Sequence, residues 1–250
     1  MIFLYLGQTK NKSQATWLAV GIFTANCLFL LTWFISSVSL SVFRLYFIPA
    51  QYIFALLTAS LFLQFAFAFP TENKSKLIKG LQICTALIVI ASVVAMILYI
   101  VAWNRDQVRL QSTYLQPQIY TIGVIYFINA LVFFSRTIYF SKQEQPNYPV
   151  WRALLQPQGR YAKATLTFAF CMLTIVMVSG SSIASNLGFI SFATYYAFFH
   201  VGLLFVFTLF VLIFLNNSSD TTSFLSKLIF STLMVAMATS TGAVVAMATA

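Results

Sequence analysis

The chain has 250 residues, of which 60% are hydrophobic and only 7% are charged, and its formal net charge at pH 7 is +10. A soluble globular domain carries roughly a quarter charged residues, so this composition excludes one and is typical of a polytopic membrane protein. The basic residues lie in short stretches between long apolar runs, which indicates a role in membrane topology and argues against nucleic-acid binding.

Seven apolar runs are long enough to cross about 30 Å of hydrocarbon as helices. They are continuous rather than alternating, which favours helices, whose backbone groups bond within the segment, over strands. The predicted fold is all-α, with a single transmembrane domain over residues 1–250. Its seven transmembrane helices are expected at 17–38, 51–69, 78–103, 119–140, 164–185, 193–215 and 224–250.

Prolines support these boundaries. Pro70 follows the run FAFAF and marks the end of the second predicted helix. Pro49 and Pro117 are placed just before the second and fourth helices, where a missing backbone N–H costs little. Residues 135–163 form the longest polar interval and are expected to be a loop.

The positive-inside rule predicts the orientation. With seven spans, one membrane side collects eleven of the 14 Lys and Arg residues, which are Lys10, Lys12, Lys74, Lys76, Lys79, Arg136, Lys142, Arg152, Arg160, Lys163 and Lys227. The other side holds Arg44, Arg105 and Arg109. The N-terminus is therefore expected in the cytoplasm and residue 250 outside.

Charged groups that would drive transport or catalysis do not fall inside the predicted spans. The four acids, Glu72, Asp106, Glu144 and Asp220, lie in loops or at helix ends. Proton-driven carriers usually keep a carboxylate at membrane depth, so this pattern disfavours them, and it leaves a retinal Schiff base without a counter-ion. A single histidine without other strong ligands makes no metal or haem site. We expect no enzymatic activity and no cofactor.

Five strong polar side chains fall in or near the spans and need partners, because lipid offers none. They are Asn26, Gln64, Gln82, Asn129 and His200. Two interpretations stay open: hydrogen bonds that hold the bundle together, worth about 0.6–2 kcal/mol each, or the lining of a ligand cavity.

The last predicted helix is rich in small residues. One face repeats them every four residues, at Ala238, Gly242, Ala246 and Ala250. Such a face lets another helix approach closely. That helix is either a neighbour in the bundle or part of another subunit.

Two runs carry a resemblance to a known family. The run WRALLQPQGRYAKATLTFAF resembles a loop motif W-R-x-L-L-x-P-x-G-R-x-A-x-A, and FLNNSSDTTSFLSKLI resembles N-x-S-P-E-x-T-S-F-x-V-K-L before the last helix. Both are similar to the N-terminal seven-helix sensor modules of bacterial membrane receptors with cyclase, histidine kinase or PP2C-type phosphatase outputs. Ser219 and Asp220 replace the usual Pro-Glu. The resemblance marks as structural or switch-like Trp151, Arg152, Leu155, Pro157, Gly159, Arg160, Asn216, Ser218, Thr222, Ser223, Phe224 and Lys227.

The resemblance implies a transmembrane sensor in a bacterial inner membrane that detects a small or lipidic ligand, or the bilayer state, and signals to a cytoplasmic output domain. It also implies a homodimer. Two alternatives remain: an accessory subunit of a larger membrane complex, and a facilitator for a neutral solute lined by Asn26, Gln64, Asn129 and His200.

Overall fold

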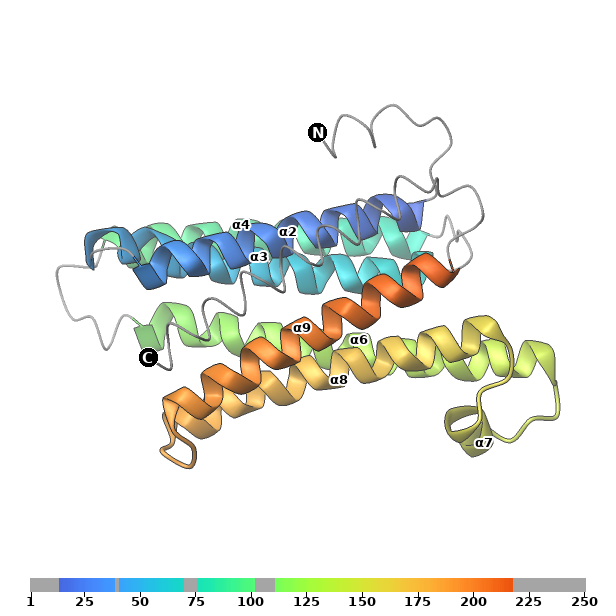
Figure 1. Cartoon of the computed structure of the whole chain (residues 1–250). Helices are drawn as coiled ribbons and strands as arrows, with labels where there is room; N and C mark the ends of the chain where they lie inside the picture. The colour runs from blue at the N-terminus through green and yellow to red at the C-terminus, as the bar shows by residue number, and fades with distance from the viewer. Residues whose placement is uncertain (1–13, 39–40, 70–75, 102–110, 218–250) are drawn as a thin grey trace. The chain divides into compact units, whose positions relative to one another are not determined.

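The computed structural model describes residues 14–38, 41–69, 76–101 and 111–217 (Figure 1). Throughout these ranges the ordered elements are helical, and no β-strand is found. The elements are α2 (Gln14–Val38), α3 (Ser41–Ala68), α4 (Lys76–Val101), the π-helical turn η1 (Gln111–Leu115), α6 (Gln116–Glu144), α7 (Val150–Leu155), α8 (Arg160–Asn186) and α9 (Phe192–Asn217).

Five of these helical stretches are long and apolar enough to cross a membrane. They are Gln14–Ser36, Tyr46–Ala68, Lys79–Val101, Thr113–Glu144 and Arg160–Ser181. The protein is thus an integral membrane protein built of helices, as the composition predicted. The sixth predicted range, 193–215, lies within α9. The seventh, 224–250, lies outside the described residues, so the number seven stays a prediction.

The chain divides into two compact units, and Ile125 and Tyr126 mark the division inside α6. In the first unit, α3 packs against both α2 and α4. Ala19 and Ile22 of α2, and Phe62 and Phe65 of α3, are fully buried. Buried side chains from both helices thus belong to the core of this unit.

In the second unit, α8 packs against α9. A row of three buried phenylalanines joins its helices: Phe168 of α8 lies between Phe133 of α6 and Phe210 of α9. The ring centroids are 5.3 Å apart for the first pair and 5.5 Å for the second. These distances are within the range of favourable aromatic pairs. Three helices therefore share one aromatic core.

Two sequence-based boundaries were wrong. Pro49 lies inside α3, not before it. A proline inside a membrane helix removes one donor, and membrane helices tolerate this where other groups satisfy the freed backbone. The polar interval 135–163 is only partly a loop, since α6 runs on to Glu144 and α8 begins at Arg160.

Arg136 consequently lies within α6. It is half-buried, and its guanidinium carbon is 5.1 Å from the Phe140 ring centroid. A long aliphatic stem and a cation–π contact allow a basic residue to remain on a membrane helix near its end.

Candidate functional site: the connection between α6 and α8

Residues 145–159 join α6 to α8 and contain the first half of the motif that carries the family resemblance. The short helix α7 lies at the end of the α6–α8 hairpin (Figure 1). Pro149 precedes it with φ −64° and ψ 142°, an extended conformation that proline adopts readily. Ala153 is fully buried, and its N–H donates to the Pro149 carbonyl at 3.0 Å. The connection is thus a folded element with its own contacts.

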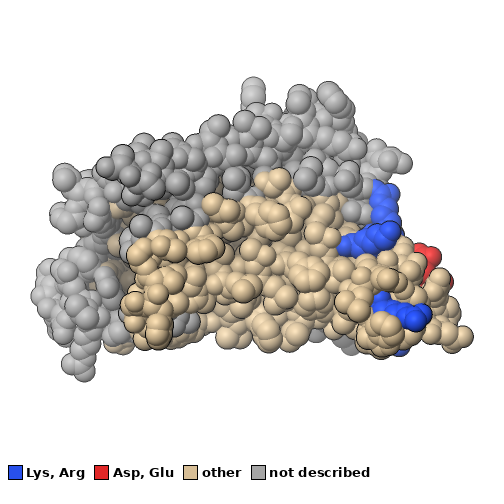
Figure 2. All heavy atoms as spheres, turned by 60° about the horizontal axis from the view of Figure 1, so that its bottom comes forward, with Lys and Arg blue, Asp and Glu red and all other residues tan. Residues whose placement is uncertain are grey.

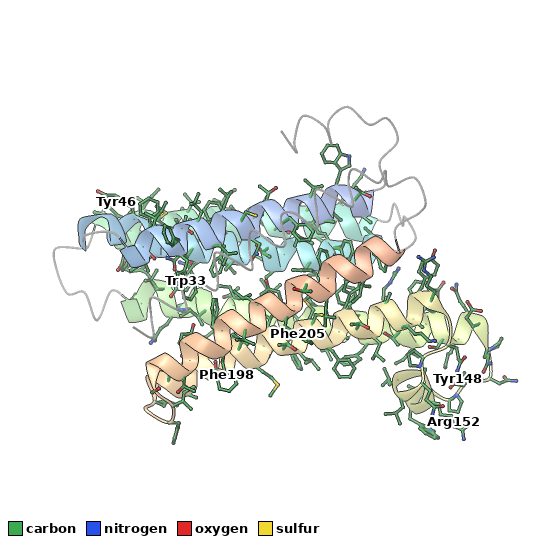
Figure 3. The ribbon with its side chains drawn as sticks, in the orientation of Figure 1. Trp33, Tyr46, Tyr148, Arg152, Phe198 and Phe205 are labelled. Carbon is green, nitrogen blue, oxygen red and sulfur yellow. The ribbon has the colours of Figure 1, made fainter. Side chains whose placement is uncertain are left out.

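A small hydrogen-bond network closes this element. The Tyr148 hydroxyl donates to the Gln156 carbonyl at 3.0 Å, and the Gln158 side-chain amide donates to the Tyr148 hydroxyl at 3.1 Å. The Gln158 backbone N–H donates to Ser141 Oγ at 3.2 Å. Because Ser141 belongs to α6 and is fully buried, the last bond ties the connection to the end of that helix. Figure 3 labels Tyr148 beside α7.

Gly159 ends the connection with a φ of +84°, a region that residues with a Cβ rarely adopt. A Cβ at this position would lie 2.9 Å from Cγ of Glu144, at the end of α6. Glycine at this motif position is therefore explained by the backbone turn into α8, because the Glu144 side chain is exposed and can rotate away.

One turn further into the hairpin, α6 and α8 are joined directly. The hydroxyls of Thr137 and Thr165 lie 3.0 Å apart, and both residues are fully buried. Each hydroxyl also contacts a carbonyl of its own helix, Phe133 for Thr137 and Tyr161 for Thr165. Ala162 and Ala164 of the motif are buried beside them. Small motif residues thus let the two helices meet closely enough for a hydroxyl pair.

The predicted motif residues differ in how far they are exposed. Trp151, Arg152, Leu155 and Arg160 are exposed, whereas Pro157 and Gly159 are half-buried. The Arg152 guanidinium carbon is 5.0 Å from the Trp151 ring centroid. In the second motif, Asn216 falls at the end of α9. Outside the described residues lie Ser218, Thr222, Ser223, Phe224, Lys227, Ala238, Gly242, Ala246 and Ala250.

The polar residues expected in the spans have different surroundings. Gln64 is buried, and its amide donates to Thr85 Oγ1 at 2.8 Å, which joins α3 to α4. Asn26 is buried in α2, and Asn129 is buried in α6. Gln82 is exposed one turn after Lys79, near the start of α4. His200 belongs to α9.

The contact seen for Gln64 is of the kind that holds a bundle together. Asn26, Gln64 and Gln82 belong to the first compact unit, and Asn129 and His200 to the second. A shared ligand cavity lined by these residues stays a prediction.

Sequence reasoning missed Ser141, Tyr148, Gln158, Thr137 and Thr165. Hydroxyl residues in the spans, and polar residues in a loop or at a helix end, give no signal of their own in a membrane sequence until their partners are known. Only the resemblance, which marks Gly159 and its motif neighbours as structural or switch-like, singled out this region in the sequence.

Over the described part of the chain, no group of three or more His, Cys, Asp or Glu side chains is placed to hold a metal ion. Comparison of the chain with protein-family models, with curated proteins and with solved structures finds no match.

Proposed function

We propose that this chain is the membrane-embedded sensing module of a bacterial receptor. It would detect a small or lipidic ligand, or the state of the bilayer, and pass the change to a cytoplasmic signalling output. What supports this proposal is the resemblance at residues 151–170, together with the way in which those residues are folded. The orientation in the proposal is a cytoplasmic N-terminus and an external residue 250 in the inner membrane, argued from the Lys and Arg distribution.

The observation that carries the proposal is the coupling of α6 to α8. Ser141 accepts a hydrogen bond from the Gln158 N–H, Gly159 fits against Glu144, and Thr137 meets Thr165. Any shift of α8 along α6 must break or remake these contacts together. A sensing module would pass its signal as a shift of population between two packings of this hairpin, which differ in these contacts.

A second candidate is an accessory subunit of a membrane complex. It is favoured by one face of α4, where apolar side chains are exposed: Ile83, Leu87, Ile90, Val94, Ile97 and Val101. Lipid alone can cover such a face, and so can another subunit. An accessory subunit needs only one packing, whereas a sensor needs two. The two candidate functions therefore differ in the number of helix packings that the protein adopts, which can be measured.

The test is a distance distribution between spin labels on α6 and α9, at Leu131→Cys and Phe205→Cys, with the native cysteines replaced. Both positions are half exposed, so the labels leave the core intact. The protein is placed in nanodiscs of short-chain or long-chain phosphatidylcholine, with or without a bacterial lipid extract. A sensing module is expected to show two distances whose populations change with bilayer thickness or extract. One unchanging distance in every bilayer would contradict the proposal and favour the accessory subunit.

A further inference from the structure

The short helix α7 exposes an unusual surface for a connection outside the membrane core. Trp151 is 60% exposed, Leu155 73% and Val150 47%. Arg152 is exposed beside them, with its guanidinium carbon over the Trp151 ring. We refer to Val150, Trp151, Arg152 and Leu155 as the α7 surface. Three apolar side chains in six residues would cost free energy if water covered them permanently.

The connection keeps α7 close to the bilayer. Four residues separate Leu155 from Arg160, where α8 begins. At no more than about 3.6 Å for each step from Leu155 to Arg160, this tether holds the end of α7 within roughly 18 Å of the first turn of a membrane-crossing helix. The headgroup layer extends about 5–8 Å beyond the hydrocarbon on each side. The α7 surface is therefore within reach of this layer.

The charges around α7 are those that an anionic surface would attract. Lys142 at the end of α6, and Arg160 and Lys163 at the start of α8, are exposed, and Glu144 is the one acid in residues 135–163. On the face shown in Figure 2, the visible Lys and Arg side chains gather at one end of the described surface. Arginine can bind a phosphate oxygen through its N–H groups while its plane stays on an aromatic ring.

We propose that the α7 surface is an interfacial anchor that binds anionic lipid headgroups of the bilayer that the protein spans. Trp151, Val150 and Leu155 enter the boundary between headgroups and acyl chains, where tryptophan is favoured. Arg152 binds lipid phosphate beside them, and Lys142 and Lys163 add attraction to the anionic layer. This inference depends on the membrane-spanning helices and is independent of the sensing role.

Arg152 is the residue whose removal tests the anionic preference. One basic residue near an anionic membrane surface contributes about fivefold to binding (~1 kcal/mol). We expect Arg152→Gln to reduce the preference for anionic over zwitterionic lipid about fivefold. The matched control is Lys79→Gln at the start of α4, an exposed residue with the same change of charge. Lys79→Gln is expected to leave unchanged the preference for anionic over zwitterionic lipid that Trp151 reports.

The measurement is quenching of Trp151 by brominated lipids, in a full chain whose other three tryptophans are changed to phenylalanine. The vesicles contain phosphatidylcholine with increasing amounts of brominated phosphatidylglycerol or brominated phosphatidylcholine. We expect both brominated lipids to quench Trp151, with phosphatidylglycerol preferred about fivefold or more. In 1 M salt this preference should be lost, because charges are then screened within about 3 Å. Circular dichroism of each variant checks its helix content.

Two results would overturn the proposal. If neither brominated lipid quenches Trp151, α7 stands away from the bilayer, and an acidic protein surface becomes its expected partner. If both lipids quench Trp151 equally and Arg152→Gln changes nothing, α7 lies in the interface without selecting anionic headgroups.

Discussion

Replacing Gly202 by valine is expected to destabilise the packing of α8 against α9 by about 1–3 kcal/mol, the usual cost of overpacking a core. A Cβ at Gly202 would lie 2.6 Å from Cγ2 of Val178 on α8. Val178 is buried, and a β-branched side chain on a helix has one strongly preferred rotamer, so it cannot move away. The gain in helix propensity on replacing glycine is at most about 1 kcal/mol and is smaller than the clash.

Unfolding of the purified protein in mixed micelles, followed by circular dichroism, checks this expectation. The control is Gly180→Val on α8, because a Cβ there meets nothing within 4 Å. The double variant Gly202→Ala with Val178→Ala should recover most of the stability that Gly202→Ala loses alone, since the clashing methyl is gone. Equal stability of Gly202→Val and Gly180→Val would show that the helices do not meet at this glycine.

Replacing Gly159 by alanine is expected to cost about 1–2 kcal/mol, because its φ of +84° is strained for any residue with a Cβ. The added Cβ would also approach Glu144, but that side chain is exposed and can rotate away. The backbone strain is therefore the larger effect. Glu144→Ala in the same chain should recover only a small part of the loss.

Two other glycines provide matched controls. Gly188 has a φ of +80° and no atom within 4 Å of an added Cβ, so Gly188→Ala should show the strain alone. Gly123 lies inside α6 with open space around it, so Gly123→Ala should be neutral or slightly stabilising. Unfolding free energies and hydrogen exchange of the Gln158 amide distinguish these cases. A Gly159→Ala variant as stable as Gly123→Ala would contradict the account of the connection.

The helices were predictable because each must satisfy its own backbone in lipid, so length and hydropathy suffice to locate it. The first five predicted ranges coincide with helices to within a few residues at most ends, and α9 covers the sixth. The start of α3 was not predictable in this way. Pro49 is a boundary signal in most contexts, and the sequence does not reveal which neighbours compensate for its missing donor.

The candidate site was predicted only as a motif. The resemblance marked Gly159 as structural or switch-like, and the structure gives that residue a positive φ at the turn into α8. Ala162 and Ala164 are buried near the hydroxyl pair of Thr137 and Thr165. The hydroxyl pair and the bond from Gln158 to Ser141 depend on which residues face each other across the hairpin. Spacing along the chain does not encode that register, so these partners could not be named beforehand.

Cysteine labelling can show on which side of the membrane each end of α8 lies. With the native cysteines replaced, single cysteines are placed at Gln145 before it and at Leu187 after it, both of which are exposed. Intact bacterial cells are treated with a membrane-impermeant maleimide. We expect labelling of Leu187→Cys in intact cells, and of Gln145→Cys only after the membrane is opened. Labelling of both positions in intact cells, or of Gln145→Cys alone, would contradict a membrane-crossing α8 with its basic connection in the cytoplasm.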